Sequence, residues 1–329
     1  MKVVELVAFG GPEQLQLVER PVPSVGTGEV RIRVEAVGVN FSDILMRLDR
    51  YAATPALPAV LGSEIAGIVE EIGPDVVDLA VGDRVVAALF ATGNSMGGYA
   101  EQVVTSEQWV APVPASVSLE QAAAALVTGL TARYLLDRSP VRGKTLLVTA
   151  AAGGVGSMLL QMARADGAHK VVAAAGGPDK CAFALSMGAH DVVDYLREDW
   201  ADRLRDSMDG ALFDIIFEST GGDVMRGAFN LLGNSAQMLI YGALNLHDFN
   251  LGVPQLGQMI FRNQSITGFA LAPLLSPASF RHAVGRVLDM VGTGEVKVAI
   301  GARHPLAQAA QAHRAIEGRQ STGKTVLLP

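Results

Sequence analysis

A glycine-rich segment between a predicted strand and a predicted helix carries the strongest chemical signal. It reads TAAAGGVGSMLLQMA, an Ala-x-Gly-x-x-Gly pattern with Ala151, Gly153 and Gly156 at the three fingerprint positions. The second position lets the backbone approach a pyrophosphate, the third lets helix and strand pack closely, and the amides at the helix start hold the anion. The order strand, turn and helix favours a dinucleotide site over a tight turn that binds nothing.

The tip of the next predicted strand indicates which nucleotide binds. Proteins that bind NAD place an acidic residue there for the ribose 2′-hydroxyl. This sequence reads KVVAAAGGPDK, so that the tip is small and uncharged, Asp179 lies beyond a proline, and Lys180 follows it. A nearby cation suits a 2′-phosphate, and we therefore predict NADPH rather than NADH. The alternative for Lys180 is a solvated residue in the first turn of a helix.

Strand-like and helix-like runs alternate around this loop, which predicts the elements that position it. Ser118, with Gln121 three residues later, is typical of a helix start. The predicted strands after it are residues 145–150, 171–175, 191–195, 213–218, 238–242 and 266–269. Their alternation with helical segments predicts a doubly wound parallel sheet of the α/β class.

The region before residue 118 has a different texture. Short runs with alternating apolar positions are separated by Gly and Pro, which predicts a mostly antiparallel β domain that forms a partly open barrel. Residues 40–47 have helical character within it. Near the end of the chain, residues 280–291 and 306–317 are predicted to be helices.

Composition limits the classes of function. The chain has 329 residues, 50% of them apolar and 18% charged, which fits two folded domains, and its net charge of −7 argues against a nucleic acid or an anionic membrane as partner. No apolar run approaches the roughly 20 residues of a membrane span. The single cysteine, Cys181, fits a reducing cytoplasm, and the N-terminal MKVVELVAFGG lacks the apolar stretch of a secretory signal.

Ordered segments between residues 9 and 329 resemble the zinc-free quinone oxidoreductase (zeta-crystallin-like) branch of the medium-chain dehydrogenase/reductase superfamily. They are FGGPEQLQLVERPVP, GEVRIRVEAVGVNFSD, LPAVLGSEIAGIVEEIG, VGDRVVA, TGLTARYLL, TAAAGGVG, GAHDVVDY and GKTVLLP. The resemblance implies a GroES-like partly open β-barrel domain from residues 1–120 and 270–329. It also implies a Rossmann domain for NADPH from residues 121–269, and an active-site cleft between the two domains.

Two positions separate this chain from the zinc-dependent alcohol dehydrogenases of the same superfamily. Those enzymes place Cys where this chain has Asn40 and His where it has Ser63, and their cysteine-rich lobe for a structural zinc is absent. The six histidines show no close metal-ligand pairing. We therefore predict no metal site and, without a Lewis acid to stabilise an alkoxide, hydride transfer to an acceptor that is already electrophilic.

The resemblance implies three residues of the acceptor site. Asn40 of the GVNFSD segment would donate its amide to an acceptor oxygen that gains negative charge, and Tyr51 would donate a hydrogen bond or stack on a planar ring. Asp43 belongs to the same segment and is interpreted as a structural hydrogen-bonding residue rather than an acid. The alternatives are a helix cap for Asn40 and packing for Tyr51. Leu45 stands where some relatives have a second Tyr, and no residue stands out as a general acid.

The resemblance also distributes the cofactor contacts along the chain. It places Thr131 at the nicotinamide end, Ala152, Gly153, Gly154, Val155 and Gly156 at the pyrophosphate, and Gly176, Lys180 and Tyr195 at the 2′-phosphate. Ser219, Tyr241, Gly242 and Phe269 would complete the groove at the carboxyl ends of the strands, and Lys324 would reach the nicotinamide side. The plain alternatives are a turn for Gly242, core packing for Phe269 and a solvated side chain for Lys324.

These features imply an NADPH:quinone oxidoreductase that transfers hydride without a metal, with the physiological acceptor left open. An alternative on the same fold is a 2-alkenal or enoyl-thioester reductase, and a thioester would need a basic entrance from clustered arginines, for which the candidates are Arg47, Arg50, Arg133 and Arg262. A non-enzymatic alternative is a crystallin-like protein that binds nucleotide or RNA without turnover. The resemblance further implies a homodimer, in which the edge strands of two Rossmann domains pair.

Overall fold

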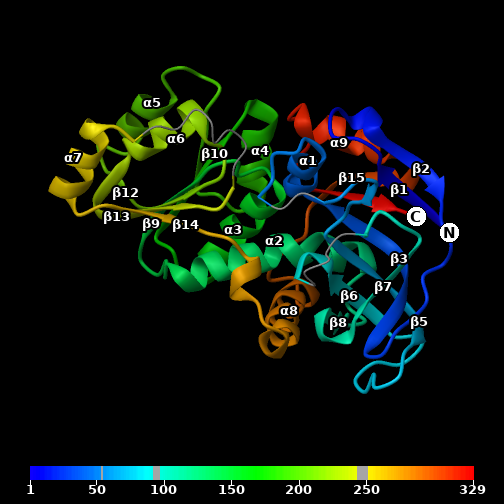
Figure 1. Ribbon diagram of the computed structural model, residues 1–329. Helices are drawn as coiled ribbons and strands as arrows, with labels where there is room; N and C mark the ends of the chain where they lie inside the picture. The colour runs from blue at the N-terminus through cyan, green and yellow to red at the C-terminus, as the bar shows by residue number, and fades with distance from the viewer. Residues whose placement is uncertain (53–54, 92–96, 243–250) are drawn as a thin grey trace. The chain divides into compact units, whose positions relative to one another are not determined.

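The computed structural model describes residues 1–52, 55–91, 97–242 and 251–329. The chain divides into two compact units, each described below by itself (Figure 1). The first unit comprises Met1–Leu130, Ala272–Gly294 and Val298–Pro329, and the second comprises Thr131–Leu271 and Glu295–Lys297. The long helix α2 (Leu119–Arg138) contains the boundary, and Ser118 caps it as predicted, with Gln121 N donating to Ser118 Oγ at 3.1 Å.

The first unit is built from two sheets in which neighbouring strands run antiparallel, apart from the β15–β16 pair. One sheet has the order β2-β1-β4, and the other has the order β15-β16-β3-β5-β6-β8 with β7 paired to β3. The strands are β1 (Lys2–Leu6), β2 (Leu15–Glu19), β3 (Glu29–Val39), β4 (Ala59–Val60), β5 (Glu64–Ile72), β6 (Arg84–Ala88), β7 (Gln102–Ser106), β8 (Val110–Pro112), β15 (Ile300–Pro305) and β16 (Lys324–Leu328).

Alternating side chains explain how these strands enclose one core. In β3, Val30, Ile32 and Val34 are buried while the residues between them are more exposed, as expected for strands with one face on a core. Side chains of both sheets, among them Val3 and Ile65, join the same apolar cluster. The described part of the same unit also contains three further helices and several 3-10 turns, and Figure 1 shows α1 beside α9. They are α1 (Phe41–Arg47), α8 (Pro277–Gly292), α9 (Ala309–Glu317) and the 3-10 turns η1 (Pro12–Gln14), η2 (Leu89–Ala91), η3 (Glu107–Trp109), η5 (Ala272–Leu274) and η6 (Leu306–Gln308).

The second unit contains the predicted doubly wound sheet. Its strands are all parallel to their neighbours and follow the order β11-β10-β9-β12-β13-β14. The strands are β9 (Thr145–Val148), β10 (Lys170–Ala175), β11 (Asp191–Asp194), β12 (Phe213–Glu218), β13 (Leu232–Ile240) and β14 (Ser265–Gly268). The order reverses between β9 and β12, the point at which such sheets bind ligands at their carboxyl ends.

Helices connect these strands and cover the sheet. They are α3 (Gly154–Ala165), α4 (Pro178–Ser186), α5 (Trp200–Ser207), α6 (Gly222–Phe229) and α7 (Val253–Arg262). Side chains of α5 and α6 share an apolar cluster with Leu147, Val172 and Ile216 of the sheet, and Figure 1 shows these two helices next to each other. Among the described residues, no helix combines the length and apolar character needed to cross a bilayer.

Among the predicted strands of this sheet, β13 departs furthest from its predicted bounds. β13 starts at Leu232, six residues before the predicted start at residue 238. Its first half contains Gly233 and Asn234, and Ser235 has a positive φ of 57°. Such residues are poor strand formers, so the sequence does not predict a strand here. The sheet nevertheless pairs this segment with β12, and the register of that pairing shifts between Phe213 and Ile215.

Candidate functional site

The turn between β9 and α3 has the geometry of a phosphate loop. A Cβ added to Gly156 would lie 2.6 Å from the carbonyl oxygen of Ala150 and 2.7 Å from Cα of Ala151, so only glycine lets α3 start this close to the strand. α3 begins after Gly153 with no side-chain cap and no acidic residue in its first turn. Its first amides are therefore available to an anion, and the helix dipole favours negative charge there.

The tip of β10 offers a second polar position in the same unit. Gly176 lies against Tyr195, whose hydroxyl would be 3.2 Å from an added Cβ, and both residues are half-buried. The carboxylate of Asp194 is held by the backbone, because Gly177 N and Leu196 N donate to its Oδ1 at 2.8 and 3.0 Å. The sequence did not predict a role for this acidic residue at the end of β11.

The ends of β12 and β13 bring three predicted residues together. A Cβ on Gly242 would lie 2.7 Å from Cβ of Ser219, and Ser219 N donates to Thr149 Oγ1 at 3.1 Å. Burial raises the pKa of Tyr241, while a hydrogen bond with Ser219 opposes that shift. Phe269, just after β14, is half-buried and donates its amide to Ile240 O at 2.8 Å. These residues therefore lie at the carboxyl ends of neighbouring strands.

Other predicted cofactor residues are placed with less detail. Thr131 is buried, Ala152 packs with Ala175 and Cys181 in a small cluster, and Val155 and Lys180 are half-buried. Burial also raises the pKa of the Cys181 thiol, because the charged thiolate is disfavoured away from water. The sulfur is thus a packing group in this cluster rather than a reactive thiolate.

In the first unit, Asn40 occupies the N-cap position of α1 and links several chain segments. Its backbone N donates to Asp43 Oδ2 at 2.8 Å, which satisfies the start of the helix. Its side-chain Nδ2 donates to Ser63 Oγ at 3.1 Å and to Glu64 Oε1 at 2.8 Å, and its Oδ1 accepts from Lys324 Nζ at 2.5 Å. Asn40 therefore caps α1 and also bonds the polar side chains around it.

A buried chain of hydrogen bonds continues from Asp43. Tyr99 Oη lies 3.4 Å from Asp43 Oδ2 and 2.8 Å from His313 Nε2, and Arg47 Nε donates to His313 Nδ1 at 3.3 Å. Because Nδ1 accepts, Nε2 carries the ring proton and Tyr99 donates onward to Asp43. Arg47 itself is fully buried, and its Nη2 donates to Glu317 Oε2 at 2.6 Å.

Burial sets the protonation of this chain. It raises the pKa of Asp43 to about 7, against the opposing hydrogen bond from Asn40 N and the charge of Lys324. Burial and the neighbouring Arg47 charge lower the pKa of His313 to about 3, so the ring is neutral at neutral pH. Tyr99 stays a phenol, because burial and the Asp43 carboxyl raise its pKa. One oxygen of Asp43, Oδ1, is buried without a partner.

Tyr51 is the exposed member of the predicted acceptor residues. Its side chain follows α1 and is 42% exposed. Partial burial raises the pKa of its phenol, and the charge of Asp43 adds to this shift. The hydroxyl therefore remains a hydrogen-bond donor at neutral pH.

Several polar residues of this region were missed from the sequence. We call Asn40, Asp43, Ser63, Glu64, Tyr99, His313 and Lys324 the Asn40 cluster. Glu64, Tyr99 and His313 escaped notice because they belong to separate segments of the chain, and none of them is a neighbour of Asn40 in sequence. An acidic residue at the start of an apolar strand-like run, as Glu64 stands before IAGIV, is a signal that could have identified one of them.

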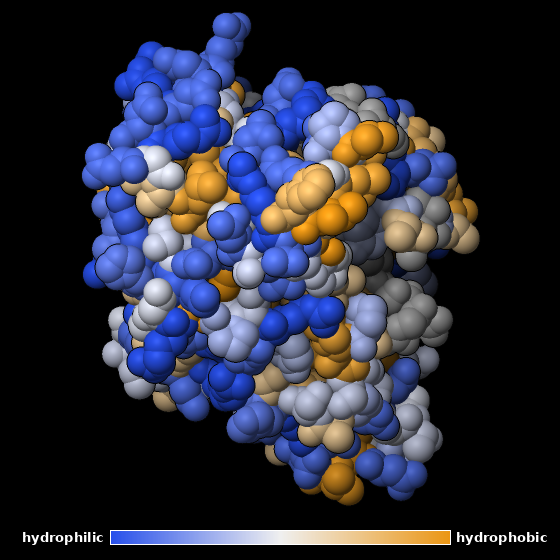
Figure 2. All heavy atoms as spheres, turned by 90° about the vertical axis from the view of Figure 1, so that its left-hand side faces the viewer, coloured by the Kyte–Doolittle hydropathy of each residue, from blue (hydrophilic) through white to orange (hydrophobic). Residues whose placement is uncertain are grey.

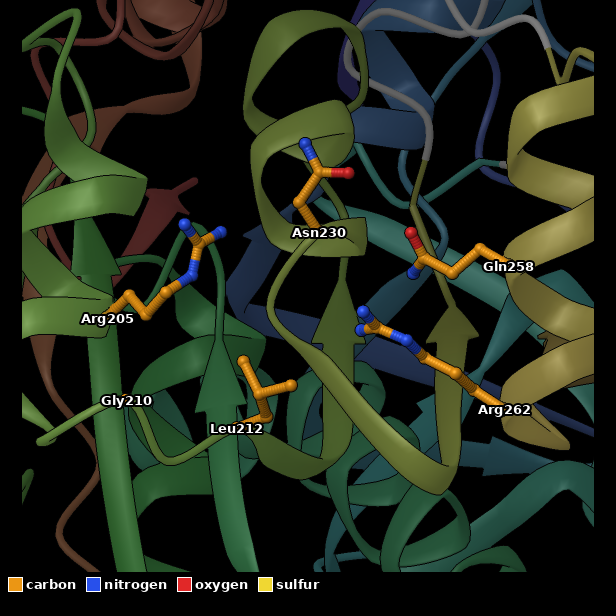
Figure 3. Close-up of a pocket in the computed structure, with 6 residues that line it drawn as sticks. All are labelled: Arg205, Gly210, Leu212, Asn230, Gln258 and Arg262. Atoms are coloured by element: carbon orange, nitrogen blue, oxygen red, sulfur yellow. The ribbon is translucent and has the colours of Figure 1, made fainter.

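Two further observations bear on ligands. Across the described parts of the chain, no group of three or more His, Cys, Asp or Glu residues is arranged to hold a metal ion. A cavity of about 430 Å³ lies in the second unit, and Figure 3 shows Gln258 and Arg262 reaching into it from α7. Its other lining residues precede β12 and β13 or end α5, so it lies at the amino ends of the strands and is separate from the phosphate loop.

Comparison with known proteins places the chain in a family. A model of the alcohol dehydrogenase GroES-like domain matches residues 26–115, and a zinc-binding dehydrogenase model matches residues 154–296. A quinone oxidoreductase of Pseudomonas aeruginosa is 34% identical, over 100% of this chain and 99% of that protein. The chain belongs to the quinone oxidoreductase branch of the medium-chain dehydrogenase/reductase superfamily.

Two other relatives extend this comparison. The structure of an Escherichia coli quinone oxidoreductase complexed with NADPH covers 100% of both chains with a TM-score of 0.92 and 31% identity, which confirms the predicted combination of a GroES-like and a Rossmann domain. A 2-haloacrylate reductase of Burkholderia sp is 32% identical over 97% of this chain and 96% of that protein. The branch therefore contains proteins named for acceptors of different chemistry.

Proposed function

We propose that this protein is an NADPH-dependent quinone oxidoreductase that works without a metal ion. The observation that carries the proposal is the start of α3, where Gly153 and Gly156 leave uncapped amides beside the switch point of a parallel sheet. The names of the relatives support the same assignment, since the E. coli structure is described as a complex with NADPH. When bound, NADPH supplies a hydride from its nicotinamide ring.

The residues of the second unit hold the cofactor in this proposal. The first amides of α3, with Gly154 and Val155, bind the pyrophosphate, while Gly176, Lys180 and Tyr195 bind the 2′-phosphate. Backbone amides hold Oδ1 of Asp194, and the tip of β10 carries no acidic residue of its own, so the ribose meets a site suited to a phosphate. Thr131, Ala152, Ser219, Tyr241, Gly242 and Phe269 line the remainder of the cofactor groove.

The residues of the first unit support the acceptor. Asn40 donates a hydrogen bond to an acceptor oxygen as that oxygen gains negative charge, and Tyr51 donates a second one or stacks on the ring. Asn40 and Ser63 stand where related zinc enzymes place metal ligands, and neither is a good zinc ligand. Conjugation in a quinone spreads the charge that the hydride delivers, so Lewis-acid assistance is not required.

The burial of Asp43 favours a quinone as acceptor, because a carboxyl group that cannot reach the substrate cannot protonate a carbon atom. Asp43 is fully buried and bonds Asn40 N, so it is a positioning residue for α1 rather than an acid that reaches a substrate. After the hydride is delivered, the reduced quinone needs one proton on oxygen, which water or Tyr51 can supply, whereas reduction of a conjugated alkene needs a donor positioned at carbon. The alternative is a 2-alkenal or enoyl-thioester reductase, which the 2-haloacrylate reductase relative supports.

Two arginines weigh against the thioester form of that alternative. Arg47 is fully buried and forms an ion pair with Glu317, and Arg133 donates to both oxygens of Asp166 at 2.6 and 3.1 Å. Neither guanidinium is therefore available as an entrance for coenzyme A or a carrier protein.

The decisive experiment compares acceptors after treatment with a chelator. NADPH oxidation is measured at neutral pH with an ortho-quinone, a 2-alkenal, a 2-haloacrylate and a short 2-enoyl thioester. We expect kcat/KM for the quinone to exceed the others at least tenfold, about 1.4 kcal/mol in transition-state binding. The reverse preference would assign the protein to the alkene reductases, and loss of all activity on chelation would contradict the metal-free chemistry.

We also propose a homodimer in the cytoplasm, with no nucleic-acid partner. α7 carries an exposed apolar face in which Val253, Ile260 and Phe261 are 83%, 73% and 89% exposed, and its strand β14 ends the described order of the sheet. Figure 2 shows apolar side chains gathered on the side of the second unit where α7 lies. An apolar patch of this kind beside an edge strand suits a second copy of the chain. The single cysteine supports the cytoplasmic location, and the net charge of −7 supports the absence of a nucleic-acid partner.

Light scattering tests the dimer. We expect a mass of twice 34.4 kDa for the wild type and 34.4 kDa for Phe261→Glu, because a charge at this face would be buried without a partner. A wild-type protein of 34.4 kDa would refute the dimer.

A further inference from the structure

A buried ion pair lies directly behind Asn40. Lys324 Nζ is 2.6 Å from Glu64 Oε1, and the two side chains are 5% and 0% exposed. The pair bridges strands β16 and β5 across β3, at the point where β3 has Gly38. A Cβ on Gly38 would overlap the carboxyl group of Glu64, so this glycine makes the space in which the pair forms.

Stability does not explain such a pair. Removing two charges from water costs as much as or more than their attraction returns, and apolar residues of similar size are often equally stable in their place. The pair is nevertheless elaborately satisfied, because Glu64 Oε2 also accepts from Val127 N at 2.6 Å. Buried ion pairs add little net stability in general, so a pair with this many hydrogen bonds points to a role in specifying a local geometry.

The geometry that it specifies is the orientation of the Asn40 amide. Oδ1 faces the ammonium of Lys324 at 2.5 Å and Nδ2 faces the carboxylate of Glu64 at 2.8 Å. A carboxylate can only accept hydrogen bonds and an ammonium can only donate them. Rotating the amide by 180° would set oxygen against carboxylate and NH2 against ammonium, so the two charges allow one orientation.

The fixed orientation directs the remaining N–H. One hydrogen of Nδ2 is taken by Glu64, and the other points to Ser63 Oγ at 3.1 Å, a longer bond to a neutral acceptor. Asn40 is half-buried, whereas Ser63, Glu64 and Lys324 are 3%, 0% and 4% exposed. Asn40 is thus the member that a ligand can reach, and an oxygen gaining negative charge is a stronger acceptor than the Ser63 hydroxyl.

We propose that Glu64 and Lys324 are positioning residues that lock the Asn40 amide so that its second N–H is presented to the hydride acceptor. Lys324 also withdraws electron density through Asn40 Oδ1 and thereby makes the N–H a stronger donor. This role rests on the proposed function, because it assigns Asn40 the acceptor oxygen. It gives Lys324 a task on Asn40 in place of a direct contact with the nicotinamide.

The first test uses charge-altering variants of the pair. Lys324→Met, Glu64→Gln and the double variant are compared with Lys324→Arg and with Lys144→Met, a control that removes a half-exposed ammonium from an ion pair of 3.8 Å in the second unit. We expect kcat with the quinone to fall about 100-fold in Lys324→Met, the size of effect seen when one oxyanion donor is lost. The Kd of NADPH should stay within twofold, and Lys324→Arg should recover part of kcat.

The double variant separates positioning from folding. A single variant leaves one buried charge unpaired and is expected to lower the unfolding temperature, whereas the double variant removes both charges and should recover it. We expect kcat to stay low in the double variant, because neither charge remains to orient the amide. Wild-type kcat in a stably folded double variant would overturn the proposal, and so would a Lys324→Met protein with weaker NADPH binding and unchanged kcat.

A second measurement does not depend on turnover. Selective ¹⁵N labelling of asparagine allows the side-chain NH2 protons of Asn40 to be followed by NMR, with Asn40→Ala giving the assignment. We expect two resolved, slowly exchanging protons in the wild type and in Lys144→Met, and faster exchange in Lys324→Met and in the double variant. Unchanged exchange in those variants would refute the lock, whereas a wild type that is inactive with quinone but shows the lock would refute only the proposed function.

Discussion

The cofactor loop of the second unit is one contiguous stretch of chain, whereas the Asn40 cluster of the first unit joins segments that are distant in sequence. The loop relies on glycines and backbone amides and has no charged side chain in the first turn of α3. The cluster relies on buried charges, with Glu64 and Lys324 bonded to one amide. The site proposed for the cofactor is thus made of backbone, and the site proposed for the acceptor is made of side chains that substitution can change.

The largest effect is expected where the loop tolerates no side chain. Gly156→Ala would set a Cβ 2.6 Å from the carbonyl oxygen of Ala150, which must move α3 away from β9. We expect the Kd of NADPH to rise about 100-fold or more and the free energy of unfolding to fall by about 1–3 kcal/mol. Fluorescence titration and denaturant unfolding measure these quantities.

A glycine in open space provides the control for this variant. Gly257 lies within α7, and an added Cβ would meet nothing within 4 Å. Gly257→Ala should leave NADPH binding unchanged and stabilise the helix by up to about 1 kcal/mol. Equal NADPH affinity of Gly156→Ala and Gly257→Ala would contradict the close approach of helix and strand.

The sequence predicted the contiguous turn between β9 and α3 better than the dispersed Asn40 cluster. Gly153, Gly156 and the strand before them form a local pattern whose conformation follows from nearby residues, so their geometry was foreseen. Asn40 was singled out, but its partners Glu64 and Lys324 lie 24 and 284 residues away. Only the pairing of β3 with β5 and β16 brings them together, and no spacing in the sequence encodes that meeting.

Buried titrating groups should give the cluster a pH-dependent stability that the loop lacks. The pKa of Asp43 is raised to about 7 in the folded state, so the native protein binds the extra proton and Asp43 lowers stability as pH rises from about 4 to 7. The pKa of His313 is lowered to about 3, so the unfolded chain binds the extra proton and stability rises with pH from about 3 to 6.5. Each contribution has an upper limit of about 4 to 5 kcal/mol.

Variants separate these opposing slopes. In Asp43→Asn the His313 contribution remains, and the free energy of unfolding should increase with pH up to about 6.5. In His313→Gln the Asp43 contribution remains, and the free energy of unfolding should decrease between about pH 4 and 7. Urea unfolding at a series of pH values measures both slopes, and slopes of the same sign in the two variants would contradict the assigned burial of the two groups.

The smallest effect is expected at the tip of β10, where we propose that the preference for NADPH over NADH is set. Lys180→Ala should raise the Kd of NADPH about tenfold and leave the Kd of NADH within twofold, because only NADPH carries the 2′-phosphate. Lys170→Ala is a matched control, because Lys170 lies at the opposite end of β10, where it forms an ion pair with Asp191. A similar loss of NADH binding in Lys180→Ala would assign Lys180 a structural role.

Single-turnover oxidation of bound NADPH tests the central claim most directly. Chelator-treated protein loaded with NADPH, or with NADPH carrying deuterium at the transferred position, is mixed with an ortho-quinone in a stopped-flow instrument. We predict full oxidation without added metal, slower with deuterium and about 100-fold slower in Asn40→Ala. Oxidation that requires added metal, or that proceeds equally fast in Asn40→Ala, would contradict the account.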